Sequence, residues 1–323
     1  MKKIASVFLV GISICSFADE VVVYGPNSMK WIGKKYAPIF KEKTGHDITF
    51  VSVDGLVPRL KLEKKNPKGD IVMGLTQVMG ETAKKEGVLE KFIPKNLNSI
   101  EDKKYIFDEE GYVTPFDYGL LAINYDAEKI KDAPKNLEDI SKLKKSLIIE
   151  DPRSATGQEL LFWSVALYGK EWKKFWNTIQ PSIYNVAPGW SEAFSKFTAG
   201  EAPMMTGYAT SSIFFYLDKA ENKYKSFIPE EGGYVYLEGA ALIKKDNVKP
   251  AAKEFMDQIL EKDFQKMLME ENYMFPVIKL ELPESFKYVP TTEKTVILNA
   301  EQVKDLSENM EKYRKELIEL LKK

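Results

Sequence analysis

The chain has 323 residues, of which 44% are hydrophobic and 29% are charged, and its formal net charge is −1 at pH 7. This balance argues against a nucleic-acid partner, because proteins that bind nucleic acid present strongly basic surfaces. The chain has one cysteine and one histidine, and it contains neither a Walker loop nor a G-x-G-x-x-G run. These counts argue against zinc sites, Ser-His-Asp catalysis and nucleotide binding, so we expect no metal ion, no cofactor and no enzyme activity.

The first 18 residues have the features of an export signal. Lys2 and Lys3 form a positive end, Ile4 to Phe17 is apolar and uncharged, and Ser16-Phe17-Ala18 is a small-x-small cleavage site. The apolar run is too short for a membrane span, which needs about 20 residues, and this argues against a retained anchor. The bulky residue before Cys15 argues against lipid attachment there. We expect cleavage after Ala18 and a periplasmic mature protein.

The first part of the mature chain alternates strands and helices, starting with a buried strand over Glu20–Gly25. This alternation predicts a parallel, doubly wound sheet, in which ligands lie beyond the carboxyl ends of the strands. Tyr24, Asp54-Gly55 and Gly74 fall at that edge. The elements predicted after the first strand are a helix over Met29–Lys43, a strand over Asp47–Val53, a helix over Leu56–Lys65 and a strand over Gly69–Gly74.

Two long extended segments, Tyr112–Tyr125 and Tyr234–Lys244, are predicted to cross between two lobes, since the chain is too long for one ordinary core. We assign residues 19–118 to lobe 1, 119–238 to lobe 2, and 239–323 to the completion of lobe 1 and the C-terminal helices. The elements predicted between the crossings are strands over Ser146–Glu150 and Pro203–Tyr208 and helices over Gly157–Tyr168 and Ser191–Thr198.

The C-terminal region is predicted to be helical over Lys249–Glu261, Asp263–Glu270 and Ala300–Lys323. In the last of these, apolar residues recur at alternating steps of three and four, which makes one apolar face. A coiled coil is an alternative, but the stretch is short for one, and we expect the face to pack against a lobe.

Two predicted helix starts could bind an anion, because the first N–H groups of a helix are unpaired and carry partial positive charge. Gly189-Trp190-Ser191 places an indole at one of them. At the other, Ser154-Ala155-Thr156-Gly157, the side chains could cap the helix itself or leave its amides for a phosphate or carboxylate. Asp54 is either a turn residue or the partner of a ligand cation. Asp117 and Glu238 lie in the crossings, where they could hold the hinge by hydrogen bonds.

The aromatic residues divide into core and cleft candidates. Trp163, Trp172 and Trp176 are predicted to be core. His46, at a turn between a helix and a strand, is expected to be a neutral surface residue. The aromatic residues at element ends, where a cleft would lie, are Tyr24, Trp31, Trp190, Tyr208, Phe214, Tyr234 and Tyr273.

Several motifs together resemble the thiamine-binding periplasmic proteins of ABC importers, with matching order and spacing from Val21 to Pro276. Asp151-Pro152-Arg153 and Gly189-Trp190-Ser191-Glu192-Ala193 are specific in combination. The others are Pro115-Phe116-Asp117-Tyr118-Gly119, Gly200-Glu201-Ala202, Tyr208-Ala209-Thr210-Ser211, Glu231-Gly232-Gly233-Tyr234 and Tyr273-Met274-Phe275-Pro276. The resemblance implies an α/β class II periplasmic binding fold with two lobes, a cleft between them and two crossings.

The resemblance also implies a function and a site. The ligand would be thiamine or its phosphates, the partner an inner-membrane ABC permease, and we expect a monomer. Phe214 and Tyr273 depart from the tyrosine and tryptophan common in the family, which leaves the phosphorylation state open. Ferric-ion, phosphonate and polyamine binders of the same fold remain alternatives, although no Tyr-Tyr pair occurs. By this resemblance Asp54 and Gly55 would face the ligand, Ser154, Thr156, Gly157, Trp190 and Ser191 would receive a phosphate, and Trp190, Tyr208, Phe214, Tyr234 and Tyr273 would form aromatic walls.

Overall fold

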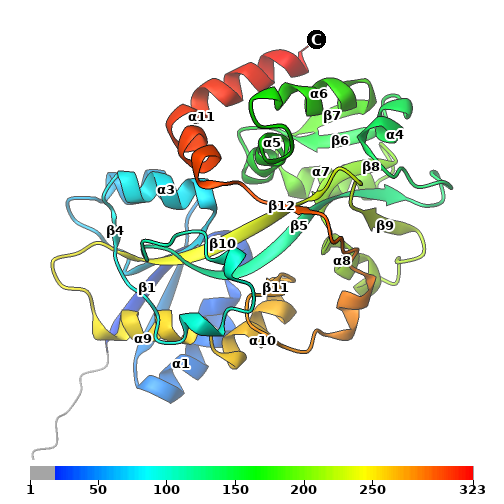
Figure 1. Ribbon diagram of the computed structural model, residues 1–323. Coiled ribbons are helices and arrows are strands. Elements are labelled where there is room, and N and C mark those ends of the chain that lie inside the picture. Colours follow the sequence, from blue (N-terminus) through cyan, green and yellow to red (C-terminus); the bar gives the residue numbers. More distant parts are fainter. Residues whose placement is uncertain (1–18, 323) are drawn as a thin grey trace, which may run out of the picture.

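A mixed sheet runs through the whole molecule, with strand order β2-β1-β3-β10-β5-β8-β6-β7 (Figure 1). The structure is a computed structural model that describes residues 19–322, so the predicted signal segment lies outside the described residues. At one end of the sheet β1 is parallel to β2 and β3, and at the other end β6 is parallel to β7 and β8. These strands are β1 (Glu20–Gly25), β2 (Asp47–Ser52), β3 (Ile71–Leu75), β6 (Leu147–Glu150), β7 (Ile183–Ala187) and β8 (Met204–Tyr208).

Two long strands, β5 (Thr114–Asp126) and β10 (Gly233–Ile243), join the two ends. They are antiparallel to each other, and β10 is antiparallel to β3 while β5 is antiparallel to β8. The parallel pairing predicted for the first part of the chain is therefore confirmed for β1, β2 and β3, and the two crossings interrupt it, because one carries the chain out and the other carries it back. We call the part around β1–β3 lobe 1 and the part around β6–β8 lobe 2. The predicted domain boundaries at 118 and 238 stay a prediction.

Helices cover both faces of the sheet in lobe 1. Alternate side chains of a strand point to opposite faces, so Val23 and Met73 pack into one apolar cluster while Tyr24 and Val72 pack into another. Both faces of these strands are buried, which explains their nearly continuous apolar sequence. The covering helices are α1 (Ala37–Thr44), α9 (Pro250–Gln258) and α10 (Lys262–Glu271) on the first face, and α2 (Leu56–Leu62) and α3 (Gln77–Lys85) on the second.

Lobe 2 has the same layered construction. Leu147 and Ile149 face one apolar cluster, and Ile148 faces another. Trp163, Trp172 and Trp176 are buried in the first of these clusters, as predicted. The helices of the first face are α5 (Ala155–Tyr168), α6 (Lys173–Ile179) and α11 (Ala300–Leu321), and α7 (Trp190–Thr198) and α8 (Ser211–Leu217) lie on the second.

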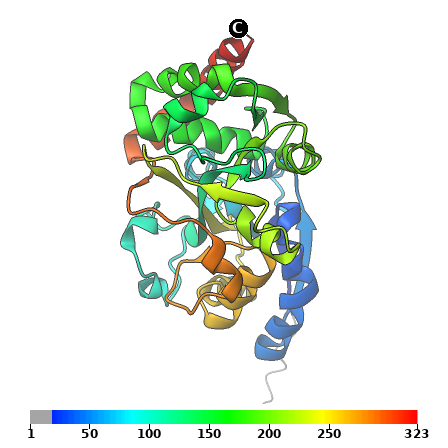
Figure 2. The same cartoon turned by 90° about the vertical axis from the view of Figure 1, so that its right-hand side faces the viewer.

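The last helix, α11, contacts both lobes (Figures 1 and 2). Leu306 and Leu317 are fully buried in the lobe 2 cluster, so the predicted packing of this amphipathic face is confirmed. On its other side, Lys85 of α3 donates hydrogen bonds to Ser307 at 3.0 Å and to Glu308 at 2.7 Å. The helix therefore ties α3 of lobe 1 to the core of lobe 2.

Some local predictions differ from the structure. The helix predicted over Met29–Lys43 is divided: a 3-10 turn and a π-helical turn come before α1, which ends at Gly45 with φ +79°. His46 is buried rather than at the surface, and its Nδ1 accepts a hydrogen bond from the backbone N–H of Asp19 at 3.0 Å. His46 is buried because Asp19, the residue before β1, hydrogen-bonds to His46 and to the backbone of Asp47.

The remaining elements are short, and apart from η1 and η2 of the divided first helix they were not predicted. Between residues 19 and 322, no helix combines the length and the apolar character that crossing a membrane requires. These short elements are β4 (Leu89–Glu90), β9 (Tyr224–Phe227), β11 (Phe275–Pro276), β12 (Thr295–Val296), α4 (Leu137–Lys142), η1 (Asn27–Met29), η2 (Ile32–Tyr36), η3 (Leu97–Ser99), η4 (Lys103–Tyr105), η5 (Gly169–Glu171), η6 (Gln180–Ser182) and η7 (Glu284–Tyr288).

Candidate ligand-binding site

The two lobes touch where β3 ends and α3 begins. Gly74, near the end of β3, has φ +83°, and a Cβ added there would lie 3.3 Å from Oε1 of Glu238 on β10. Val78 of α3 packs in the apolar cluster of lobe 2. The carboxyl edge of the lobe 1 sheet therefore lies against the crossings and against lobe 2, as expected for a site between the lobes.

Three of the predicted aromatic residues form one group. The ring centres of Trp190 and Phe214 are 5.8 Å apart, and those of Phe214 and Tyr273 are 4.9 Å apart with their planes at 72°. Phe194, one helical turn beyond Trp190, stacks on its indole at 4.8 Å. All four side chains are half-buried, so part of each remains exposed. We call these four residues the aromatic group.

Thr156, Tyr208 and Tyr234 lie in a second group, together with Tyr236, which the sequence analysis did not single out. The Tyr208 and Tyr236 ring centres are 5.5 Å apart, and the Thr156 hydroxyl faces that of Tyr208. The second group adjoins the aromatic group through Gly207. A Cβ at Gly207 would lie 2.6 Å from Nδ2 of Asn124 and 3.4 Å from Nε1 of Trp190, so the glycine keeps β8 close to both side chains.

The start of α5 shows why its sequence is Ser154-Ala155-Thr156-Gly157. Ser154 Oγ accepts a hydrogen bond from the backbone N–H of Gly157 at 3.1 Å and donates one to the Asp151 carbonyl at 2.8 Å. A Cβ on Gly157 would lie 2.0 Å from that carbonyl oxygen. The serine thus caps its own helix, and the glycine permits a close backbone approach. Binding of an anion at this helix start stays a prediction.

The other predicted site residues are spread over separate elements of the two lobes. Asp54 is exposed, Gly55 has φ +72° and precedes α2, and Ser191 is exposed in the first turn of α7. Tyr24 packs in the lobe 1 core, and its hydroxyl donates a hydrogen bond to Glu63 at 2.9 Å. Trp31 is also a core residue, with its ring 5.2 Å from Phe264. Neither of these two aromatic residues is in contact with the aromatic group.

Buried carboxyl groups lie around the tyrosines of the second group. Asp117, Glu150, Glu159 and Glu238 are each at most 6% exposed. None of them takes part in the ion pairs found among residues 19–322. The sequence analysis treated two of them as hinge residues and missed Glu150 and Glu159. The available signal was a carboxylate inside an otherwise apolar run, as in Glu159-Leu160-Leu161-Phe162.

Burial controls the ionisation of these groups, because the charged form loses its hydration. It raises the pKa of Glu150 and of Glu159 to about 8, and the pKa of Glu238 to about 7. The pKa of Asp117 is raised well above its usual value by burial and then by the negative charge of Glu238. These four buried carboxyl groups lie close to several tyrosines, and among residues 19–322 no lysine, arginine or histidine is found beside them.

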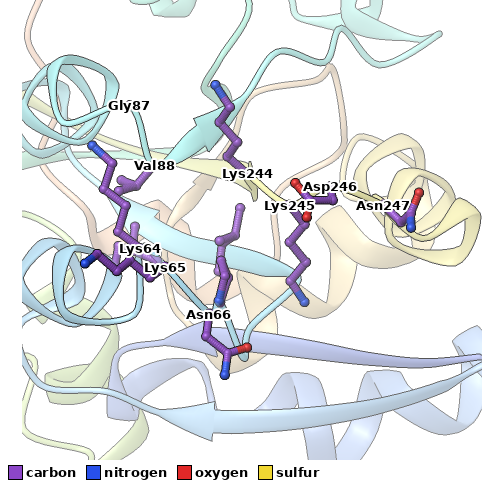
Figure 3. A pocket seen from close by; sticks show the side chains of 12 residues that line it. Lys64, Lys65, Asn66, Gly87, Val88, Lys244, Lys245, Asp246 and Asn247 are labelled. Atoms are coloured by element: carbon purple, nitrogen blue, oxygen red, sulfur yellow. The ribbon is translucent and has the colours of Figure 1, made fainter.

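A surface pocket of about 680 Å³ lies elsewhere in lobe 1. Figure 3 shows Lys64 and Lys65 on one side of it and Lys244 and Lys245 on another. Lys245 pairs with the buried Asp70 at 2.6 Å. No aromatic side chain lines this pocket, so it lacks the ring faces found between the lobes, and none of the predicted site residues belongs to it.

Comparison with known proteins supports a solute-binding role for this chain. Residues 66–305 match the model of a family described as bacterial extracellular solute-binding proteins. The chain is 34% identical over 291 residues to a thiamine-binding periplasmic protein of Brucella melitensis, covering 87% of this chain and 86% of the relative. It is 30% identical over 236 residues to the Escherichia coli protein of the same name, covering 72% and 71%.

Solved structures of binding proteins share the fold of this chain. A periplasmic thiamin-binding protein superposes with a TM-score of 0.80 at 25% identity, covering 94% of this chain and 96% of that one. The apo ferric ion-binding protein A of Pasteurella haemolytica also reaches a TM-score of 0.80, at 17% identity and with 94% and 98% coverage, so that likeness shows the fold alone. From the family match, the curated relatives and the geometry between the lobes, the chain belongs to the family of bacterial extracellular solute-binding proteins.

Proposed function

We propose that this protein captures thiamine or a thiamine phosphate between its lobes and delivers it to an inner-membrane ABC permease. In this proposal the protein is exported, its signal is removed after Ala18, it acts in the periplasm as a monomer, and it has no enzyme activity of its own. The names of its relatives, which are thiamine-binding periplasmic proteins, support this choice of ligand and location.

The observation that carries the proposal is the combination of a half-buried aromatic group with buried carboxyls that lack a positive partner. Thiamine joins a flat aminopyrimidine to a thiazolium ring with a permanent positive charge. Aromatic faces attract such a cation, and the rings of Trp190, Phe214 and Tyr273 contact one another to form one aromatic surface on which a flat heterocycle could stack. Asp117, Glu159 and Glu238 would supply the opposite charge.

The anionic end of a phosphorylated ligand would bind at the helix starts. The N-cap residue of α7 is Gly189, which has no side chain to occupy the first amides of that helix, and such free amides bind phosphate readily. At α5, Ser154 occupies one amide. We therefore assign the phosphate first to the start of α7, beside Trp190 and Ser191.

Titration calorimetry on the purified mature protein tests the proposed function. We expect thiamine or one of its phosphates to bind more tightly than millimolar. If every thiamine form fails to bind, the proposal is wrong. An iron-dependent colour on addition of ferric citrate, with no thiamine binding, would assign the protein to the ferric binders of the same fold.

A further inference from the structure

We propose that binding of the cationic ligand is coupled to the release of protons from three buried carboxyl groups, Asp117, Glu159 and Glu238, which we call the carboxyl cluster. This inference rests on the proposed function and adds a regulatory property to the same site: the affinity for the ligand depends on pH. The cluster joins the two crossing strands to α5 of lobe 2.

The first two members are neighbours across the crossings. Asp117 on β5 and Glu238 on β10 are directly opposed in the antiparallel register, so their side chains lie on the same face of the sheet. Asn272 donates a hydrogen bond to Oδ2 of Asp117 at 3.1 Å, while Oδ1 of Asp117 is buried without a partner. The Tyr236 hydroxyl also faces Glu238. Every group facing this pair is neutral or acidic.

Glu159 brings α5 to the same region. Its carboxyl faces the Tyr234 hydroxyl and the Thr76 hydroxyl, and the charge of Glu238 acts on it. Its Oε2 atom is buried without a hydrogen-bond partner. Tyr208 lies within the influence of Glu159 and Glu238, and also of Glu150 on β6. No lysine, arginine or histidine is among the described groups that face the cluster from β5, β6, β8, β10, α5 or the start of α3.

A second observation indicates that the cluster receives a ligand. Thr76 comes from the carboxyl end of the lobe 1 sheet, it is 7% exposed, and its hydroxyl faces Glu159 without a hydrogen-bond partner. A buried polar group is costly when it is unpaired. The Thr76 hydroxyl and Oε2 of Glu159, both without a hydrogen-bond partner, therefore meet from the two lobes near Glu238, where a donor or a cation would satisfy them.

The charge of the ligand should make its affinity for the protein higher at higher pH. Without the ligand, burial and mutual repulsion hold protons on the cluster, with pKa values of about 8 for Glu159 and about 7 for Glu238. A thiazolium charge nearby favours the ionised carboxylates and lowers these pKa values. Binding then transfers protons from carboxyl oxygens to the solvent or buffer, and no other bond changes. The affinity should rise with pH between about 6 and about 8 and level off above that range, since the free protein has then lost the same protons.

Calorimetry with unphosphorylated thiamine tests the coupling, because its thiazolium charge does not titrate. At about pH 7, the binding enthalpy should differ between two buffers of different ionisation enthalpy, in proportion to the protons released. The Kd should fall about tenfold per pH unit for each proton released. Glu159→Gln and Glu238→Gln should each reduce the released protons and weaken binding, while Glu293→Gln, which neutralises an exposed carboxylate, should change neither.

The outcomes separate this inference from the proposed function. Tight thiamine binding with the same Kd from pH 6 to pH 8 and no buffer dependence would overturn the coupling and leave the function intact. Proton release that is unchanged in both glutamine variants would overturn its assignment to the cluster. Failure of thiamine to bind at any pH would overturn both.

Discussion

Glu159 illustrates how far the role of one residue depends on its surroundings. Its sequence position, at the head of an apolar helix, shows only that a charged side chain interrupts a buried surface. The structure adds that this carboxyl faces Tyr234 and Thr76 and is 3% exposed. A carboxylate in the core is usually paired or protonated. A solute-binding protein for a cation has a third option, since the ligand itself can be the partner.

Trp190 provides the most direct test at the level of a single residue. Trp190→Ala should weaken thiamine binding by ~1–3 kcal/mol, because it removes the aromatic face and the cation–π attraction. Titration calorimetry measures the change, and Trp190→Phe, which keeps a ring, should restore part of it. Tyr184→Ala is a suitable control, since Tyr184 is an aromatic residue on β7 that is 48% exposed. Equal affinities for wild type and Trp190→Ala would contradict the role assigned to this indole.

At the level of elements, α11 connects parts that are distant in sequence. Its N-terminus carries a capping box, in which Asn299 and Gln302 exchange side-chain and backbone hydrogen bonds at 2.9 Å. Gln302 also donates to the Val165 carbonyl of α5 at 2.8 Å, and Lys173 of α6 pairs with Glu316 at 2.8 Å. Because these contacts reach two helices of lobe 2, α11 forms part of the lobe 2 core as well as touching α3.

Truncating the buried face of α11 should therefore destabilise the protein. Leu317 is fully buried, so Leu317→Ala should lower the free energy of unfolding by ~2–5 kcal/mol through lost burial and a residual cavity. Urea unfolding followed by circular dichroism gives this value. Leu62→Ala on α2 makes the same chemical change at a side chain that is 82% exposed, and it should cost less than about 0.5 kcal/mol. If the two variants are equally stable, α11 does not belong to the core.

On the scale of the whole molecule, the arrangement requires the lobes to separate for a ligand to enter. Thr76 and Val78 of lobe 1 meet lobe 2 in this structure. The strands β5 and β10 run from one lobe to the other, and the segment after α10 passes to lobe 2 again to form α11 (Figure 1). The register of β10 against β5 shifts between Glu238 and Gly239. Such an irregularity is a natural place for a hinge, and it lies beside the carboxyl cluster.

Hinge closure predicts a change in overall size on binding. We expect small-angle X-ray scattering to show a smaller radius of gyration when thiamine is added, because the ligand bridges groups on both lobes and favours the closed form. The crossings near 117–122 and 237–241 would absorb the motion. An uncharged sugar without an aromatic ring should leave the radius unchanged, and an unchanged radius with saturating thiamine would argue against hinge closure.

Local patterns in the sequence predicted most of the architecture. The alternation of strands and helices indicated the parallel strands of lobe 1, the long apolar runs indicated the two crossings, and the steps of three and four indicated the buried face of α11. These predictions succeeded because strand and helix periodicities depend on neighbouring residues only. The motifs around Asp117 and Trp190 likewise indicated the family before any contact was known.

Only the tertiary structure decided which side chains meet. It placed Tyr24 in a core beside Glu63 although its strand ends at the expected edge, buried His46 under the first strand, and brought Glu159, Glu238 and Thr76 together from three separate elements. A sequence pattern shows that a residue is buried, but its partner is set by chain crossings between segments far apart in the sequence. The pKa of a carboxyl depends on that partner, so the ionisation of the site follows from the fold and could not be predicted from the sequence alone.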